Sequence, residues 1–316
     1  FFYPINLLCI IYRALKYALD DNVMKLKLVD TSQEVKDVEN AQLLKVSDAV
    51  IRLYNVCFDY NKDRKILDKV SFDIPHGHKV AVVGPSGAGK STLLALLAGL
   101  DLPTDGHVVL NKANLSDLDE DGRAQLRAES VGFVFQSFHL VPSLNALENV
   151  MLPLELASHE HPRQTATQAL ENVGLGERAG HYPRQLSGGE KQRVAIAGIL
   201  AMKPDCIVLD EPTAMLDPVG RNECMDTIEM VNKDEGITVI HITHFMEEAI
   251  RADRVVVIEE GQIIIDGTPK EVFQEVEKLQ DMGLDVPQVT LMAHKLREQG
   301  LDIRSDVLTV EEMVES

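Results

Sequence analysis

Residues 84–92 have the types and the spacing of a loop that binds phosphate. They read GPSGAGKST, which fits the pattern G-x-x-x-x-G-K-[ST] directly after an apolar run, Lys79–Val83. Glycines let the backbone N–H groups of such a loop surround phosphate oxygens, and the helix that follows points its positive end at them. Lys90 would lie against the β- and γ-phosphates, and the Ser91 hydroxyl would coordinate Mg²⁺. The nucleotide-binding residues predicted from this loop are Gly84, Ser86, Gly87, Gly89, Lys90, Ser91 and Thr92.

Two adjacent carboxylates follow a second apolar run. Asp210 and Glu211 come directly after Cys206–Leu209. In a parallel sheet the ligand lies outside the carboxyl ends of the strands, where the phosphate loop also begins. Asp210 is then placed to hold Mg²⁺, and Glu211 to orient or deprotonate the water that attacks the γ-phosphate. Without the phosphate loop, this acidic pair would indicate only a solvated strand end.

The elements that must position these residues alternate between strand and helix patterns. Short β-branched runs, typical of strands buried on both faces of a parallel sheet, lie at 79–83, 206–209 and 238–242. The expected helices are at 91–100 and in most of 137–184, and the expected hairpin is at 254–266. Strands that alternate with helices predict an α/β fold.

Composition limits the class of protein and its partners. Of 316 residues, 45% are hydrophobic and 26% are charged, as in ordinary globular proteins. The formal charge of −19 argues against a nucleic-acid partner, because phosphate neutralisation needs clustered Lys and Arg. Four widely spaced cysteines without a C-x-x-C pair indicate reduced thiols in a cytosolic compartment, not a zinc site or a disulfide framework.

The two ends of the chain differ from its middle. Residues 1–12 carry no charge and precede Arg13 and Lys16, but a membrane span needs about 20 apolar residues. This segment is interpreted either as an amphipathic or buried helix or, as we favour, as the end of a truncated membrane helix. Residues 30–48 are polar and indicate a linker.

The last part of the chain is acidic. Residues 271–316 hold eleven acidic and four basic side chains. Val272, Phe273, Val276 and Leu279 recur at helical spacing, which predicts one short amphipathic helix. We interpret this tail as a solvated appendage packed on the main domain, without a catalytic role.

Further motifs complete a pattern that resembles the ATP-binding cassette (ABC) ATPases. Residues 186–193 read LSGGEKQR and resemble the signature of that family, with Glu190 where Gln is more frequent. The matching residues occur in family order: Tyr60, Lys90, Gln136, Ser187, Asp210, Glu211, Asp217 and His244. The resemblance covers about residues 50–267 and is specific as a set.

The resemblance implies a role for each of these residues. Tyr60 would stack on adenine, Gln136 would be the Q-loop residue and a Mg²⁺ ligand, and His244 would be the switch histidine. Asp217 would belong to the D-loop. A lone Gln is usually a surface residue and a lone His a structural one, but both of these follow apolar runs. A neutral His244 could therefore hydrogen-bond the γ-phosphate in the transition state.

The signature also has a local structural interpretation. Ser187 and Glu190 form the pattern of a helix capping box, and Gly188 and Gly189 would leave N–H groups exposed at a positive helix end. By family analogy, each ATP lies between one subunit's phosphate loop and the other subunit's signature. The resemblance thus implies ATP-dependent dimerisation, as a homodimer or a heterodimer.

The family also implies a fold and a division into domains. The expected fold is a P-loop NTPase three-layer sandwich with an antiparallel β subdomain and a helical subdomain at about 137–186. The expected domains are a membrane-proximal helix and linker at 1–48, the ABC ATPase domain at 49–267 and an acidic tail at 268–316.

Different segments resemble different branches of the family. Residues 1–90 resemble exporter half-transporters of the mitochondrial iron–sulfur type. Residues 92–197 resemble ATPases of the lipoprotein-releasing or macrolide-export type, and residues 195–316 resemble an energy-coupling factor ATPase. We interpret the chain as a mosaic, with switches inside the phosphate loop and the signature.

The predicted function is that of an ABC transporter subunit that hydrolyses ATP with Mg²⁺. It would couple ATP binding, dimer closure and hydrolysis to transmembrane transporter subunits through the helical region. It would be peripheral at the cytoplasmic face of the cell membrane or tethered there by a truncated N-terminal helix. The alternatives are a soluble ABC ATPase, an inactive chimeric ATP-binding module, and a P-loop kinase or GTPase. The signature and His244 argue against the last.

Overall fold

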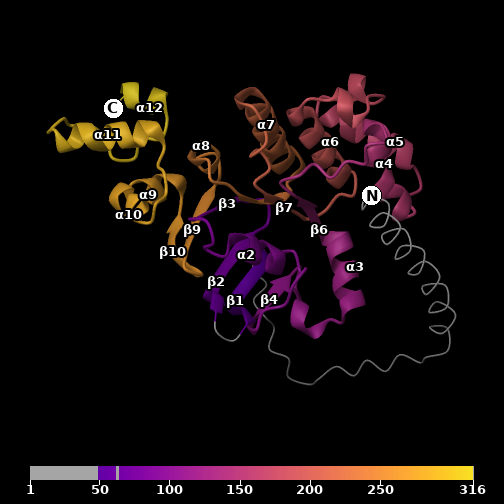
Figure 1. Cartoon of the computed structure of the whole chain (residues 1–316), viewed down its shortest axis with the longest axis horizontal. Helices are drawn as coiled ribbons and strands as arrows, with labels where there is room; N and C mark the ends of the chain where they lie inside the picture. The colour runs from indigo at the N-terminus through magenta and orange to yellow at the C-terminus, as the bar shows by residue number, and fades with distance from the viewer. Residues whose placement is uncertain (1–48, 62–63, 316) are drawn as a thin grey trace. The chain divides into compact units, whose positions relative to one another are not determined.

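The computed structural model describes residues 49–61 and 64–315, which form two β-sheets and the helices packed on them (Figure 1). These residues belong to one compact unit, Val46–Ser316. The membrane-proximal helix and linker predicted at 1–48 lie outside the described residues. Within 49–61 and 64–315, no helix combines the length and the apolar character needed to cross a bilayer. Cys57, Cys206 and Cys224 are buried free thiols.

The larger sheet has six strands in the order β10-β9-β3-β8-β7-β6. The five strands from β9 to β6 are parallel, and β10 pairs antiparallel with β9. Their bounds are β3 Lys79–Val83, β6 Val131–Val134, β7 Cys206–Asp210, β8 Thr238–Ile242, β9 Arg254–Glu259 and β10 Gln262–Gly267. The predicted parallel sheet and the predicted hairpin are confirmed.

Alternate residues of the buried strands face two different cores. In β3, Val80 and Val82 belong to a core that also contains the leucines of α2 (Lys90–Leu97). Ala81 and Val83, which point to the opposite face, pack in a second core with helices from the end of the chain. The central sheet is therefore covered on both faces, as its uninterrupted apolar strands predicted.

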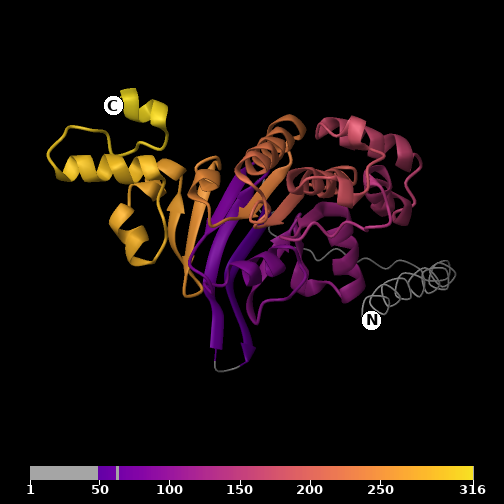
Figure 2. The ribbon, with the colours of Figure 1, turned by 45° about the horizontal axis from the view of Figure 1, so that its top comes forward.

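A second, antiparallel sheet shares the first of these cores. Its strands are β1 Ala49–Asn61, β2 Arg64–Pro75, β4 Asp105–Leu110 and β5 Ala113–Asn114, in the order β2-β1-β4-β5. The long β1–β2 pair can be followed in Figure 2. Apolar side chains of β1, β2 and β4 pack with those of α2 and of the central strands. This sheet is the antiparallel β subdomain that the resemblance implied.

Helices α4 (Ala146–Leu156), α5 (Pro162–Asn172) and α6 (Gly188–Leu200) pack around one apolar cluster. The predicted helical region begins later than expected, because residues 137–145 contain no helix. A capping box at Asn145 and Glu148 starts α4 instead. On the other side of α6, α7 (Pro218–Glu235) packs against β7 and β8.

The single helix predicted over Val272–Leu279 was wrong, since the chain forms two helices. These are α9 (Pro269–Phe273) and α10 (Val276–Asp281). The backbone of Glu275 has non-helical dihedral angles, φ −80° and ψ 49°. Its N–H donates a hydrogen bond to the Val272 carbonyl and so closes a tighter turn than that of an α-helix. The bend still lets all four predicted apolar side chains bury in the core that contains β3 and β9.

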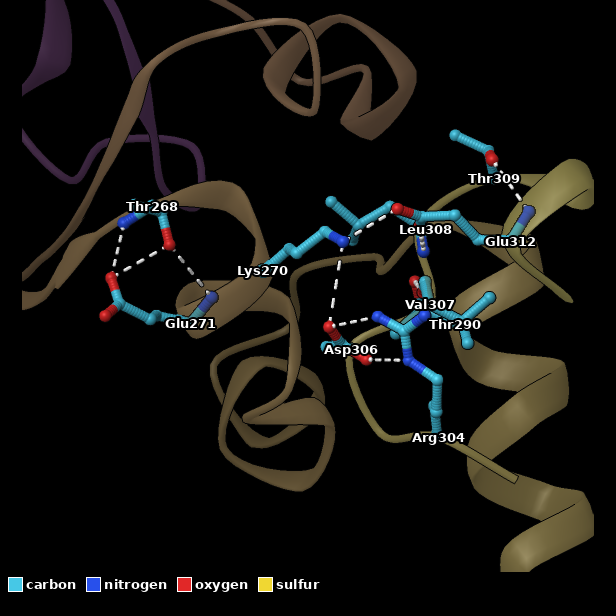
Figure 3. A network of polar contacts seen from close by, with 10 residues as sticks. All are labelled: Thr268, Lys270, Glu271, Thr290, Arg304, Asp306, Val307, Leu308, Thr309 and Glu312. Atoms are coloured by element: carbon cyan, nitrogen blue, oxygen red, sulfur yellow. Dashed lines mark hydrogen bonds and ion pairs between the residues drawn. The ribbon is translucent and has the colours of Figure 1, made fainter. Parts of the chain in front are cut away.

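A polar network joins α9 to α12 (Val310–Glu315) and to the loop before it, as Figure 3 shows. Thr290 of α11 (Gln288–Glu298) donates a hydrogen bond to the Val307 carbonyl in that loop at 2.7 Å. Lys270 Nζ lies 2.7 Å from Glu312 Oε1 and 3.6 Å from Asp306 Oδ2. Arg304 pairs with the same aspartate at 2.7 Å. The described part of the tail is therefore attached by an apolar core and by ion pairs.

Candidate nucleotide site

The phosphate loop connects β3 to α2 and depends on its glycines. A Cβ at Gly84 would lie 2.2 Å from the carbonyl oxygen of Ile258. Gly89 has a φ of +97°, and a Cβ there would lie 2.8 Å from the carbonyl oxygen of Ile66. Only glycine fits such crowded and left-handed positions. The backbone of the loop is therefore accessible to a ligand at its exposed residues, Ser86 and Gly87, where few side-chain atoms lie over it.

Lys90 folds back onto the loop that precedes it. Its Nζ donates hydrogen bonds to the carbonyl oxygens of Gly84 at 2.5 Å and Pro85 at 2.8 Å. Burial lowers the pKa of Lys90, while the carboxylates of Glu211 and Asp210 act in the opposite direction. The predicted lysine and both predicted acids are thus within electrostatic reach of one another. Ser91 is exposed in the first turn of α2, and Thr92 is half-buried.

The acidic pair lies at the carboxyl edge of the central sheet. Asp210 ends β7 opposite Ile242 of β8, and Glu211 N donates to the Ile242 carbonyl at 3.1 Å. Burial, followed by the nearby Glu211 charge, raises the pKa of Asp210. Glu211 has a φ of 47°, a left-handed conformation that residues other than glycine adopt at a cost. Such strain persists only where the surroundings enforce it, and it is concentrated at functional sites.

Two residues from neighbouring strand ends converge on Glu211. Gln136 follows β6, and its Nε2 lies 3.5 Å from Glu211 Oε2. His244 follows β8, and its Nδ1 lies 3.5 Å from Glu211 Oε1. Residues 136, 211 and 244, which are far apart in the sequence, therefore meet at one point.

The signature residues begin α6 in the geometry of a capping box. Glu190 N donates to Ser187 Oγ at 3.2 Å, and Ser187 N donates to Glu190 Oε2 at 2.7 Å. The hydrogen bond from the Ser187 backbone lowers the pKa of Glu190. The predicted capping box is thus present.

The signature lies beside the predicted D-loop. A Cβ at Gly189 would lie 3.0 Å from Gly220 Cα, and one at Gly188 would lie 3.1 Å from Leu216. Asp217 caps α7 by accepting a hydrogen bond from Gly220 N at 3.3 Å. These signature contacts run to the D-loop segment and not to the phosphate loop. Tyr60 belongs to β1, but its side chain is outside the described part of the structure.

One buried acid near the site was missed by the sequence analysis. Glu248, in α8 (Met246–Ala249), is only 2% exposed and bonds the hydroxyls of Thr213 and Thr243. The available signal was its position between apolar Met246 and Ala249. That signal is weak, because the neighbouring Glu247 is exposed.

Comparison with known proteins gives relatives that are similar to most of this chain. The family described as ABC transporter matches residues 67–214. An energy-coupling factor transporter ATP-binding protein, EcfA1, from Caldanaerobacter subterraneus subsp. tengcongensis is 48% identical over 273 residues, covering 84% of this chain and 98% of the relative. EcfA1 from Clostridioides difficile is 44% identical over 273 residues with the same coverage of both chains.

Two solved structures resemble the fold. A dimeric post-hydrolysis state of the ATP-binding cassette MJ0796, bound to ADP and Pi, has a TM-score of 0.63 and 37% identity, covering 69% of this chain and 98% of that chain. CbiO1 from Clostridium perfringens, part of the ABC transporter complex cbiONQ, has a TM-score of 0.68 and 32% identity, covering 79% and 99%. Sequence and fold comparisons therefore agree.

Proposed function

This chain belongs to the ABC transporter ATPase family, and from that premise we propose how its residues serve a transporter of the energy-coupling factor type. It is the ATP-binding subunit and hydrolyses ATP. In our proposal, Lys90 exchanges its two backbone carbonyl partners for the β- and γ-phosphates of ATP. The loop N–H groups surround the same phosphates, and Tyr60 stacks on the adenine.

Mg²⁺ fits the oxygen donors at the edge of the sheet. The Ser91 hydroxyl, the Asp210 carboxylate and the Gln136 amide oxygen are the hard ligands that this ion binds. Burial and the Glu211 charge raise the pKa of Asp210, and a bound cation would act in the opposite direction by favouring the charged carboxylate. When bound, Mg²⁺ would neutralise phosphate charge.

The convergence of Gln136 and His244 on Glu211 carries the proposed mechanism. Glu211 orients and deprotonates the water that attacks the γ-phosphate, since its carboxylate is held from two sides at 3.5 Å. His244 then hydrogen-bonds the γ-phosphate and stabilises the charge that develops there. All three groups follow the ends of neighbouring strands of the central sheet, which suits a reaction catalysed mainly by positioning.

Mg²⁺-dependent ATPase activity of the full chain tests these roles. Lys90→Ala should abolish nucleotide retention, because it removes the only charge placed on the phosphates by the loop. Glu211→Gln should retain ATP without turning it over. Lys112→Ala and Glu235→Gln, at exposed positions, are matched controls that should keep both properties. Equal activity in all five proteins would refute the mechanism.

The proposed partners are a second ATPase subunit and transmembrane transporter subunits. The signature of one subunit would close over the phosphate loop of the other, and the second subunit is either the same chain or a related one. An apolar cavity of about 380 Å³ beside the Q-loop supports a docking site for the membrane subunits. Its lining includes Phe135, Phe138, Pro153 and Ile199, next to Gln136 and the helical region. The chain would then be peripheral at the cytoplasmic face of the membrane.

The mosaic interpretation stays a prediction for its first two segments. The similarity to energy-coupling factor ATPases extends over 273 residues, well beyond the third segment, 195–316. We propose that segments 1–90 and 92–197 derive from other branches. Separate comparison of each segment with those branches tests this, and a uniform similarity to EcfA1 along the chain would exclude it.

A further inference from the structure

The buried carboxylate of Glu248 connects two loops that carry proposed catalytic residues. Its Oε2 accepts a hydrogen bond from Thr243 Oγ1 at 2.7 Å, and its Oε1 accepts one from Thr213 Oγ1. Thr243 directly precedes His244, and Thr213 is two residues after Glu211. Both threonines are 1% exposed, so these bonds are shielded from water.

Thr243 also fixes the backbone on both sides of His244, in the segment 243–245 that we call the histidine loop. Its Oγ1 accepts a hydrogen bond from Phe245 N at 3.0 Å while its hydroxyl proton goes to Glu248. His244 lies between these two bonded residues. The orientation of the histidine is therefore set by the same hydroxyl that Glu248 holds.

A third segment joins this network through Arg221 of α7, the helix that follows the D-loop. Arg221 Nε lies 3.9 Å from Glu248 Oε1. The guanidinium carbon of Arg221 lies 3.5 Å from the centre of the Phe245 ring, a cation–π contact. Glu248 thus contacts three segments: the loop that contains Glu211 and Thr213, the histidine loop, and the start of α7.

A gain in folding stability does not by itself explain why the Glu248 carboxylate is buried. Burial raises the pKa of Glu248, and the bonds from the two threonines and the Arg221 charge only oppose that shift. A buried ion pair is often no more stable than an apolar replacement of the same volume. The carboxylate does, however, offer two acceptor oxygens to two separate loops, which an apolar side chain cannot do.

We propose that Glu248 is a positioning residue for ATP hydrolysis, holding Glu211 and His244 at the separation that the reaction requires. It acts through Thr213 and Thr243 and does not touch the nucleotide. This inference rests on the roles of Glu211 and His244 given above.

Steady-state ATPase kinetics of the full chain test the inference first. Glu248→Gln keeps the volume but only one acceptor oxygen, so kcat should fall about 10- to 100-fold, as expected for misplaced groups. KM for MgATP should stay within about threefold, because the phosphate loop is untouched. Glu247→Gln, the exposed neighbour in the same helix, should leave both constants unchanged. An unchanged kcat in a folded Glu248→Gln chain would overturn the inference.

A double-mutant cycle with His244→Ala separates positioning from a merely structural role. If Glu248 acts through the histidine loop, Glu248→Gln should cause little further loss of single-turnover rate in the His244→Ala background. If Glu248→Gln lowered the single-turnover rate by the same factor in both backgrounds, the inference would be contradicted. Full activity of His244→Ala itself would instead contradict the proposed function.

The threonines give a second test that does not depend on Glu248 variants folding. Thr243→Val has almost the same shape but lacks the hydroxyl, and should lower kcat as Glu248→Gln does. Thr243→Ser keeps the hydroxyl and should retain most of the activity. Equal rates for the Val and Ser variants would exclude the proposed link.

Discussion

Burial acts against the charge of both groups that would bind Mg²⁺ and phosphate. It lowers the pKa of Lys90 and raises the pKa of Asp210. Each group therefore gains from a bound partner of opposite charge, and MgATP supplies one to each of them at once. The folded chain therefore holds two half-buried charged groups, and bound MgATP would place an opposite charge next to each of them.

A fully buried titratable residue, His241 in β8, makes stability depend on pH. It is completely buried, and burial lowers its pKa to about 3. In the unfolded chain its pKa is near 6.5, so below that pH the unfolded state binds a proton that the folded state does not bind. The stabilising effect of neutral His241 is complete above pH 6.5 and is lost progressively as the pH falls toward 3.

His241→Leu should flatten this pH dependence. Between pH 7 and pH 4.5, the wild-type free energy of unfolding should fall by about 2.7 kcal/mol more than that of the variant, at 1.36 kcal/mol per pH unit. Urea unfolding at four pH values measures this difference. His76→Leu, at an exposed position, should follow the wild-type curve. Parallel curves for wild type and His241→Leu would show that the histidine does not titrate on unfolding.

At the scale of elements, the capping box that starts α4 occurs again at two functionally different places. Ser187 and Glu190 begin α6 in the signature, and Thr268 and Glu271 begin α9 in the tail (Figure 3). Both boxes satisfy backbone N–H groups at an exposed helix start. Only the signature cap would also meet a nucleotide, held by the partner subunit.

Ser187→Ala and Thr268→Ala should therefore separate stability from activity. Each should lower the free energy of unfolding by about 1 kcal/mol, because each removes one N-cap acceptor. Only Ser187→Ala should also lower kcat for ATP. Thermal unfolding and ATPase assays of both variants measure the two effects. Equal kcat values in the two variants would limit the signature serine to a structural role.

The sequence predicted those elements whose signals are local. The phosphate loop, the strand Cys206–Leu209 and the hairpin after Arg254 each combine a short pattern with its own turn residues. It could not predict the break at Glu275, which depends on how Val272 and Val276 fit a distant sheet. Nor could it distinguish Glu248 from Glu247, because the buried partners of Glu248 lie 5 and 35 residues away.

At the scale of the whole molecule, two large apolar side chains next to the D-loop are exposed. Met215 is 63% and Val219 is 65% exposed, on either side of Asp217. They adjoin the signature, since the carbonyl oxygen of Met215 lies near Gly188. In our proposal these two residues belong to the surface that meets the second subunit, because the signature beside them would close over that subunit's phosphate loop.

The Glu211→Gln chain should therefore dimerise when saturated with ATP and Mg²⁺, because it binds the nucleotide but cannot hydrolyse it. Size-exclusion chromatography with light scattering measures the mass. Adding Val219→Asp should keep the chain monomeric without loss of ATP binding, because an acid in the first turn of α7 suits the helix but not an apolar interface. Val310→Asp, at a 62% exposed position in the first turn of α12, is the matched control and should leave dimerisation intact. A Glu211→Gln chain that stays strictly monomeric at saturating MgATP would contradict the shared nucleotide site.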